Sequence, residues 1–437
     1  MDNRAVISAG EGGVNLTGNP FIDVGFGIAA CEVGRPSIEA LSSDDLCRAV
    51  GNLHANIEKL RSFKMLASFW VNNPFMGKNL GQKPKFEEFL CGLETGRLPL
   101  RAGHCQVCGR PRVINTAATG CQADRCWFPL AGSGVSDPCT LPGLQDKAIC
   151  CECLCAAVIL PIGCRSCPDG PYFIHVTEPD LQVEAASEGV RVLTAAFSTN
   201  AGDAVRHDTY LRGRLALLEI VSGSVLWDQS QPGHMTRIPQ SGATAISFSN
   251  RGEGPCFNEL HLPAQALEFF AAITEAGVRE VFRQWALDAQ DFAKKTKRRY
   301  YLNELCGGVE ERRSLAPLLV SFVRGRKDGR LRKGEYKVLQ IYEDVALRRK
   351  ERFDTLQRIA EKVRQMPSRY SESFIKQLGN LSSKNTLLDL LKDFSKKERG
   401  LKVTPSELRV INDGPVNDIT SLLYLLCIAE EEGGEHA

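Results

Sequence analysis

The spacing of apolar positions gives the two parts of the chain different characters. Before residue 263, short apolar runs are separated by turns rich in Gly, Asn and Asp, and these runs have the length and composition of β-strands. Predicted strands are YFIHV, VRVLTAAF, LALLEIV and TAISFS. Near the N-terminus, polar residues Ser42 to Asp45 cap a predicted helix through LCRAVGNLHANIEKLRSF. The first part is therefore predicted to mix α and β structure.

From residue 263 onward, apolar residues recur at steps of three and four, which is typical of amphipathic helices. Such helices are predicted in ALEFFAAITEAGVREVFRQWALDAQDF, in TLLDLLKDF, in DITSLLYLLCIAEE and in the long segment EYKVLQIYEDVALRRKERFDTLQRIAEKVRQM, which Pro367 ends. We predict an α+β chain with a mixed α/β domain over residues 1–262, a cysteine-rich zinc module inserted at about 103–170, and a helical bundle over residues 263–437.

Composition and apolar run lengths indicate the class of protein and its cellular location. Its 437 residues are 43% hydrophobic and 24% charged, as in ordinary globular proteins of two or three domains. The longest apolar runs fall well short of the roughly 20 residues that a membrane-spanning helix needs. The N-terminus lacks the basic and apolar regions of a signal peptide. These patterns predict a cytoplasmic protein with no membrane partner.

Charge is distributed unevenly along the chain, although the net charge is only +2. Residues 294–402 hold 29 Lys and Arg against 14 Asp and Glu, a net charge of +15, and the remainder is acidic. This excess predicts that the helical region binds nucleic-acid backbone; the alternative is a solvated basic face or a protein-contact surface. The densest runs are Lys294, Lys295, Lys297, Arg298 and Arg299, and then Arg324, Arg326, Lys327, Arg330, Arg332 and Lys333.

Cysteines mark the candidate metal site. Eleven of the 17 cysteines lie between residues 105 and 167, and in a reducing compartment such clustering indicates metal ligation rather than disulfides. Cys105 and Cys108 form a CxxC pair followed by Gly109, the pattern of a knuckle that points two thiolates at one centre. Two CxxC pairs are typical of structural Zn²⁺ held by four thiolates.

The second ligand pair is ambiguous from the residues alone. Cys164 and Cys167 have Gly and Pro neighbours that suit a turn, which slightly favours them. Cys150 and Cys153 precede an apolar segment in which thiols can be buried as small apolar groups. Three further cysteines are loop residues or belong to a second site: Cys121, Cys126 and Cys139.

Enzymatic motifs are scarce. The chain has no GxxxxGK[ST] loop and no HExxH motif, and Gly25-Phe-Gly27 is too short for a dinucleotide fingerprint. His175 and His261 lie in apolar runs, where we predict ordinary packed histidines. We therefore predict a protein without catalytic activity; the alternative is a zinc-ribbon nucleic-acid enzyme, such as a nuclease, with a dispersed active site.

Three stretches together resemble the CRISPR-associated CXXC–CXXC family, whose members are large subunits of type I-A/I-B Cascade effector complexes. They are TGNPFIDVG at residues 17–25, the CxxC module, and ISFSNRGEGP at residues 246–255; VNNPFM also resembles a loop of that family. The resemblance covers residues 17–262 in patches, and the helical third matches only in kind. The family places its second CxxC before an apolar segment ending in Pro-x-Gly, here AAVILPIG. The resemblance thus implies the zinc ligands Cys105, Cys108, Cys150 and Cys153, although the surplus cysteines depart from the family pattern.

The resemblance also implies a function in antiviral defence. Such subunits bind the CRISPR RNA and the Cascade backbone subunits, recognise the protospacer-adjacent motif in target double-stranded DNA, and support R-loop formation. A helicase-nuclease or a transposition machinery is then recruited. Guide pairing reads the target sequence, and protein reads only the short flanking motif.

Two polar loops are candidates for reading that motif. Asn and Gln side chains can donate to and accept from base edges, and nearby Gly and Pro let a loop reach into a groove. The alternative is that these are turns in which Asn is chosen for its backbone conformations. The candidates for facing bases are Asn73, Asn79 and Gln82 in the first loop and Asn250 in the second, and the candidates for holding phosphates are Lys78, Lys83 and Arg251.

Overall fold

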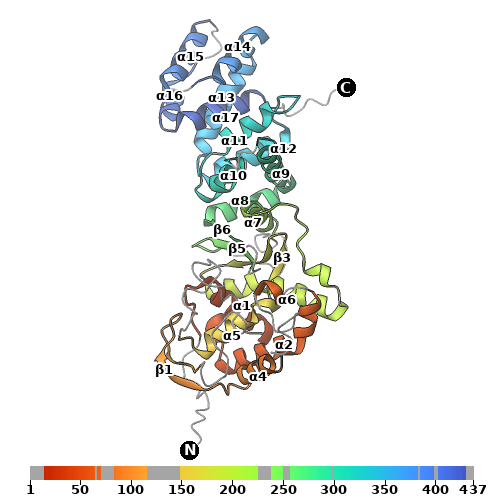
Figure 1. Ribbon diagram of the computed structural model, residues 1–437. Helices are drawn as coiled ribbons and strands as arrows, with labels where there is room; N and C mark the ends of the chain where they lie inside the picture. Colours follow the sequence, from red (N-terminus) through yellow and green to blue (C-terminus); the bar gives the residue numbers. More distant parts are fainter. Residues whose placement is uncertain are drawn as a thin grey trace, which may run out of the picture. The chain divides into compact units, whose positions relative to one another are not determined.

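The computed structural model describes residues 14–63, 66–69, 83–115, 148–224, 238–249, 256–296, 300–381, 384–397 and 402–429. The chain divides into two units, residues 1–261 and residues 262–437 (Figure 1). This division lies next to the boundary predicted from the sequence. The prediction of a mixed α and β chain is confirmed, since both helices and small sheets are present.

The first unit combines helices with two small sheets. Its helices are α1 (Pro20–Val33), α2 (Ser43–Ser62), α3 (Leu66–Phe69), α4 (Lys83–Glu94), α5 (Cys151–Ile159), α6 (Pro179–Thr199) and α7 (Arg214–Ser222), with short 3-10 turns η1 (Ile38–Ala40), η3 (Leu160–Ile162) and η4 (Gly202–Val205). Strands β1 (Leu100–His104) and β2 (Pro111–Ile114) form an antiparallel hairpin. The other sheet has the order β3 (Arg165–Cys167), β4 (Gly170–His175), β5 (Ala243–Ser249) and β6 (Cys256–Leu262).

Helix α1 lies at the centre of the first unit, among α2, α5 and α6 (Figure 1). Its residues from Phe21 to Ala30 are buried. A Cβ atom at Gly25 would lie 2.1 Å from the carbonyl oxygen of Ala156 on α5. One at Gly27 would lie 2.8 Å from the carbonyl oxygen of Gln182 on α6. The two glycines therefore allow backbone-to-backbone packing of α1 against both neighbours, and they do not form a dinucleotide loop.

Two strand predictions are wrong. VRVLTAAF is part of α6, and its buried positions Val190, Leu193 and Ala196 follow a step of three, which is helical. LALLEIV is part of α7. All of its residues are buried, so the sequence has no apolar periodicity that could distinguish a helix from a strand. The predictions for YFIHV and TAISFS are confirmed by β4 and β5.

The two histidines that were predicted to be packed differ in their burial. His175 is buried on β4, and its Nε2 lies 3.3 Å from a carboxylate oxygen of Asp23, so that prediction is confirmed. His261 is exposed on β6, with its Nδ1 3.0 Å from the hydroxyl of Thr244. The prediction for His261 is wrong because alternate side chains of a strand point to opposite faces, and His261 lies on the solvent side.

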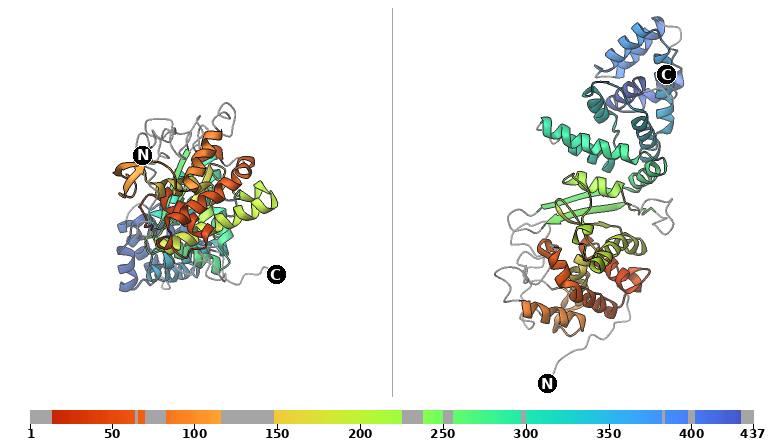
Figure 2. Two further views of the ribbon diagram at one scale, coloured as in Figure 1. Left: turned by 90° about the horizontal axis from the view of Figure 1, so that it is seen from below. Right: turned by 90° about the vertical axis from the view of Figure 1, so that its right-hand side faces the viewer.

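The described part of the second unit is helical. Its elements are α8 (Ala264–Glu275), α9 (Arg279–Thr296), α10 (Tyr300–Glu310), α11 (Ala316–Arg324), α12 (Lys333–Ile341), the π-helical turn η6 (Tyr342–Ala346), α13 (Lys350–Arg364), α14 (Ser368–Leu378), α15 (Lys384–Lys397), α16 (Pro405–Asn412) and α17 (Val416–Cys427). Figure 2 shows these helices from two further sides. Among the described residues, none of the helices has both the length and the apolar character that crossing a membrane requires.

The long helix predicted to end at Pro367 is broken in the middle. It consists of α12, the turn η6 and α13, and Arg348 between them has a left-handed backbone with φ 54°. The break places two charged side chains in the interior: Glu343 is fully buried, and its carboxylate accepts a hydrogen bond of 2.5 Å from the guanidinium of Arg352. Apolar periodicity continues through the break, so the sequence pattern did not reveal it.

Candidate metal centre

The first cysteine pair lies in the tight turn between β1 and β2. The amide of Gly109 donates to the carbonyl of Cys105 at 2.8 Å, and the amide of Cys105 donates to the carbonyl of Arg110 at 2.8 Å. Gly109 has a φ of 74°, a conformation that a residue with a Cβ rarely adopts. This turn directs the thiols of Cys105 and Cys108 to the same side.

The second pair begins helix α5. Cys150 is the N-cap residue, and its sulfur accepts a hydrogen bond from the amide of Cys153 at 3.4 Å. Residues just before the helix pair with the hairpin: Gln106 donates to the carbonyl of Ala148, and Ile114 to that of Ile149, both at 2.9 Å. These bonds hold the N-terminus of α5 against the β1–β2 turn, and the partial positive charge of a helix N-terminus favours thiolates there.

The four sulfur atoms converge on one point. The Sγ atoms of Cys105, Cys108, Cys150 and Cys153 all lie within 4.8 Å of one another, and those of Cys108 and Cys150 are 3.6 Å apart. Sulfurs bound tetrahedrally to zinc at about 2.3 Å lie about 3.8 Å from each other. The cluster therefore has the size of a four-thiolate metal site. In the part of the chain that the structure describes, it is the one group of three or more metal-ligating side chains so arranged.

The pKa values of the four cysteines favour the binding of a cation. The pKa of Cys105 lies well below its usual value because the thiols of Cys108, Cys150 and Cys153 donate hydrogen bonds to its thiolate. The pKa of Cys153 is raised, since its thiol is a donor to the thiolates of Cys105 and Cys108 and is buried. The protein alone thus lowers the pKa of Cys105 and of Cys108 and raises the pKa of Cys150 and of Cys153, so only part of the cluster ionises readily. A divalent cation at the centre would supply the charge that lets all four sulfurs ionise.

Cys108 is the most accessible of the four cysteines. Beside it is a recess of about 180 Å³, lined in part by Asn15, Thr17 and Arg110. The Arg110 guanidinium lies 3.5 Å from the carboxylate of Glu152, which follows Cys150 and Cys151 on α5. The other three cysteines of the cluster are buried, which is typical of a closed structural site rather than of a catalytic one with an open position.

Among the residues that the structure describes, the other cysteines do not join this cluster. Cys164 is buried in the core, and Cys167 lies on β3, so the pair favoured by its turn context is not beside Cys105 and Cys108. The choice of Cys150 and Cys153 agrees with the geometry. Three other loop cysteines lie outside the described residues: Cys121, Cys126 and Cys139.

A second group of thiols was missed from the sequence. On the opposite side of α5, the sulfurs of Cys151 and Cys155 are 4.0 Å apart. The thiol of Cys47 on α2 hydrogen-bonds to Cys155, and these contacts with burial raise the pKa of Cys155 well above its usual value. The i, i+4 spacing of Cys151 and Cys155 was the available signal, but Cys47 is distant in sequence.

The candidate groove-reading loops are largely outside the described residues. This applies to Asn73, Lys78, Asn79, Gln82, Asn250 and Arg251. Lys83 is the first residue of α4, and its ammonium lies 2.6 Å from the carboxylate of Glu58. A surface ion pair of this kind leaves Lys83 able to exchange partners, so its contact with phosphate stays a prediction.

The basic runs of the second unit are only partly accessible. Lys294 and Lys295 are exposed near the end of α9, whereas Lys297, Arg298 and Arg299 lie outside the described residues. Arg326 is half-buried, and its guanidinium pairs with Glu335 at 2.6 Å and with Asp288 at 3.2 Å. We therefore remove Arg326 from the candidate surface because its hydrogen bonds hold the fold together. Its exposed neighbours stay candidates: Arg324, Lys327, Arg330, Arg332 and Lys333.

The stretch TGNPFIDVG forms the start of α1. The side chain of Asn19 caps the helix by accepting from the amides of Phe21 and Ile22. The carboxylate of Asp23 accepts from the amide and hydroxyl of Thr17, at 2.7 and 2.8 Å, and from the next amide at 3.0 Å. These residue types are therefore explained by a closed loop that positions a buried helix.

Comparison of the chain with family models, with curated proteins and with solved structures finds no match.

Proposed function

We propose that the chain is a non-catalytic large subunit of a CRISPR RNA-guided DNA-surveillance complex, with a structural zinc ion in its first unit. In this role it would recognise the flanking motif of duplex targets, support strand opening, and recruit a helicase-nuclease or a transposition machinery. The proposal rests on the resemblance of three stretches to one family, and on how those stretches are arranged in the fold.

One observation supports the proposal more than any other: the three stretches meet around α1. TGNPFIDVG supplies the N-cap residue and the first turns of α1. The aromatic ring of Phe21 lies 5.4 Å from that of Phe248, which belongs to the stretch at residues 246–255. Gly25 packs against Ala156 on α5, the helix that carries the second cysteine pair. Sequence segments far apart in the chain thus pack against one another in one structural unit.

The zinc ion would act as a structural element in this unit. Cys105, Cys108, Cys150 and Cys153 would hold it, and it would link the β1–β2 hairpin to the start of α5. Four thiolates without an open position suit structure rather than catalysis. The exposed cations near α11 and α12 would contact nucleic-acid backbone without sequence preference.

The direct test is to purify the tagged chain after co-expression with the products of its neighbouring genes, and to sequence the bound RNA. The proposal predicts small RNAs that each contain a spacer flanked by CRISPR repeat sequence, together with backbone subunits. Recovery of the folded chain without such RNA, or with unrelated cellular RNA, would contradict it.

A second assay separates the proposal from a zinc-ribbon nuclease. The purified chain is incubated with end-labelled single-stranded and duplex DNA, with Mg²⁺ and with Mn²⁺. The proposal predicts intact substrates at all times. Cleavage that co-elutes with the chain, and that is lost together with the zinc, would support the enzyme instead.

A further inference from the structure

A segment of the first unit runs as an extended strap beside β3. It covers residues 205–212, and Arg206 forms a parallel bridge with Ser166. The amide of His207 donates to the carbonyl of Ser166 at 2.8 Å. Side chains alternate as they do on a strand. The buried ones are Val205, Thr209 and Leu211. The exposed ones, on the opposite face, are Arg206, Asp208, Tyr210 and Arg212.

Buried hydrogen bonds fix the strap in this conformation. The hydroxyl of Thr209 donates to the buried carboxylate of Glu219 and accepts from the amide of Leu211 at 3.2 Å. At the end of the strap, the amide of Gly213 donates to the carboxylate of Asp169 at 2.6 Å, and Gly213 has a φ of 61°. The exposed face is therefore organised before any ligand arrives, which lowers the entropic cost of binding.

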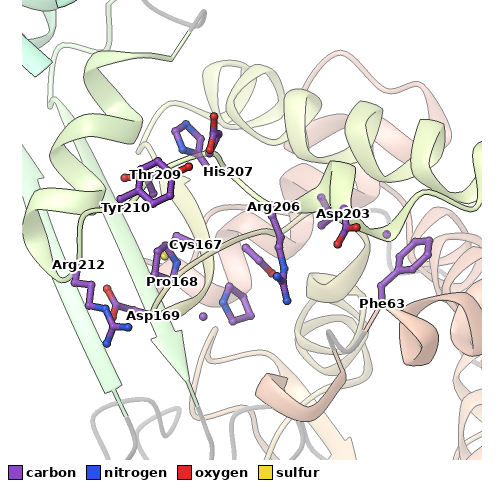
Figure 3. Close-up of a pocket in the computed structure, with 16 residues that line it drawn as sticks. Phe63, Cys167, Pro168, Asp169, Asp203, Arg206, His207, Thr209, Tyr210 and Arg212 are labelled. Carbon is purple, nitrogen blue, oxygen red and sulfur yellow. The ribbon is translucent and has the colours of Figure 1, made fainter.

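The strap borders a recess of about 680 Å³, shown in Figure 3. The turn from β3 to β4, with Pro168 and Asp169, lies on one side, and Phe63 and Asp203 lie at the other end. This volume falls within the range of pockets that hold small ligands or single building blocks of a polymer. The recess is lined by the first unit alone.

Tyr210 has an unusual exposure for an aromatic side chain. It is 79% exposed, and among the described residues it is the one large hydrophobic side chain that is so open to solvent. Tyr loses little conformational entropy when it binds, and its ring offers a flat face for stacking. A rigid strap that holds such a ring beside a recess favours a ligand with a planar aromatic group.

The charged residues around the ring of Tyr210 further restrict the class of ligand. Arg206 and Arg212 are exposed, and neither forms an ion pair with a carboxylate of the described residues. Guanidinium groups suit phosphate. Asp203 and Asp208, also exposed at the recess, can accept hydrogen bonds from the amino groups of bases. A ligand with only negative charge would leave these aspartates without a partner, whereas a nucleotide offers phosphate to the arginines, an aromatic face to Tyr210 and amino donors to the aspartates.

We propose that the strap and its recess bind a short stretch of single-stranded nucleic acid, with a base stacked on Tyr210 and phosphates on Arg206 and Arg212. The two arginines lie on either side of Tyr210 along the strap, so a base stacked on the ring would leave phosphates of a continuing strand for both of them, which favours a strand over a mononucleotide. This site goes beyond the proposed function and does not depend on it, because it is argued from the strap alone.

The test is the affinity of the full-length chain for a fluorescent single-stranded DNA of about twelve nucleotides, a length within the usual site sizes. Tyr210→Ala is expected to weaken binding about tenfold or more, and Tyr210→Phe to restore it, because stacking needs the ring and not the hydroxyl. Arg206→Ala and Arg212→Ala are each expected to reduce the slope of affinity against salt by about one ion. Arg191→Ala, an exposed arginine on α6, is the matched control and is expected to bind like the unmodified chain.

A second measurement locates the contact. A 4-thiothymidine oligonucleotide is cross-linked to the chain by light, and the linked peptide is expected to contain Tyr210, even if basic surfaces elsewhere also bind DNA. The proposal is overturned if the unmodified chain does not bind, if Tyr210→Ala binds equally well, or if a mononucleotide binds as tightly as the oligonucleotide. It is also overturned if no cross-linked peptide contains Tyr210. Failure to recover guide RNA would leave this result unaffected and would count against the proposed function alone.

Discussion

The two units of the chain stabilise their interiors in different ways. In the first, α1 packs backbone to backbone against α5 and α6 through glycines, and four thiols converge at the start of α5. In the second, an aromatic cluster includes Phe269, Phe282 and Tyr342, and the ion pair of Glu343 and Arg352 is buried. The first unit therefore adds close backbone approach and a thiol cluster to its side-chain packing, whereas the described part of the second relies on side-chain packing and paired charge.

The largest expected effect is the loss of a metal ligand. Cys153→Ser should release the metal and expose the amides of the β1–β2 hairpin and of α5, because metal binding and folding are coupled and contribute on the order of several kcal/mol. Hydrogen exchange should show this loss in the first unit, with α13 and α17 unchanged. Cys91→Ser, at an exposed free cysteine, is the control. Equal protection of α5 in both variants would remove the contrast between the units.

The second unit should be most sensitive to its buried charges. Arg352→Ala leaves the carboxylate of Glu343 buried without its partner and should cost about 3–5 kcal/mol of unfolding free energy. Urea denaturation monitored by hydrogen exchange of α13 measures this cost. The exposed pair of Arg409 and Asp413 supplies the control, since Arg409→Ala should cost less than about 1 kcal/mol. Similar costs for the two variants would show that burial of the pair is unimportant.

Close backbone packing in the first unit predicts a third effect. Gly25→Ala places a methyl group 2.1 Å from the carbonyl oxygen of Ala156, so α1 and α5 must separate, at a cost of about 3 kcal/mol. Gly51→Ala on α2 is the matched control, because its new methyl would meet only the flexible end of Glu94. Since alanine favours helix by about 1 kcal/mol over glycine, that variant should melt at the same temperature or higher. Thermal melting that ranks the two variants the other way would contradict the packing.

The smallest expected effect is a dependence on acid in the first unit. Burial acts to raise the pKa of Asp45, but hydrogen bonds from Arg35 and Ser42 outweigh it and lower the pKa from 3.8 to about 2. The resulting stability is present above the unfolded value and is lost as the pH falls from 3.8 through about 2. Asp45→Asn should therefore cost roughly 2 kcal/mol at neutral pH and nothing at the acid end. An identical pH profile for Asp45→Asn and for the exposed control Asp44→Asn would refute this assignment.

The predictions from the sequence succeeded where local signals agree with tertiary structure. The polar residues before α2 form a capping box between Ser42 and Asp45, as their types suggested. Strands β4 and β5 are almost entirely buried and lie between turns, and they were predicted correctly. Helix α7 is buried on all sides, so its apolar run has no period and was taken for a strand. The break at Arg348 accompanies a buried ion pair of Glu343 and Arg352, which no local pattern reveals.

For the candidate metal site, too, the sequence predicted local features but not contacts between distant residues. The turn around Cys105 and Cys108 was evident from CxxC and Gly109 alone. The second pair was not, because turn residues around Cys164 favoured the wrong choice and only the resemblance pointed to Cys150. The exposure of Tyr210 follows from the pairing of its strap with β3, a contact between residues far apart in sequence. No spacing rule predicts such a contact.

The measurement that most directly tests the contrast between the two units is the metal content of the intact chain by native mass spectrometry. The account predicts one zinc ion per chain, which is lost in Cys105→Ser and in Cys150→Ser and is retained in Cys164→Ser. A chain that carries no metal yet keeps full hydrogen-exchange protection in α1 and α5, or one that loses its zinc only in Cys164→Ser, would contradict it.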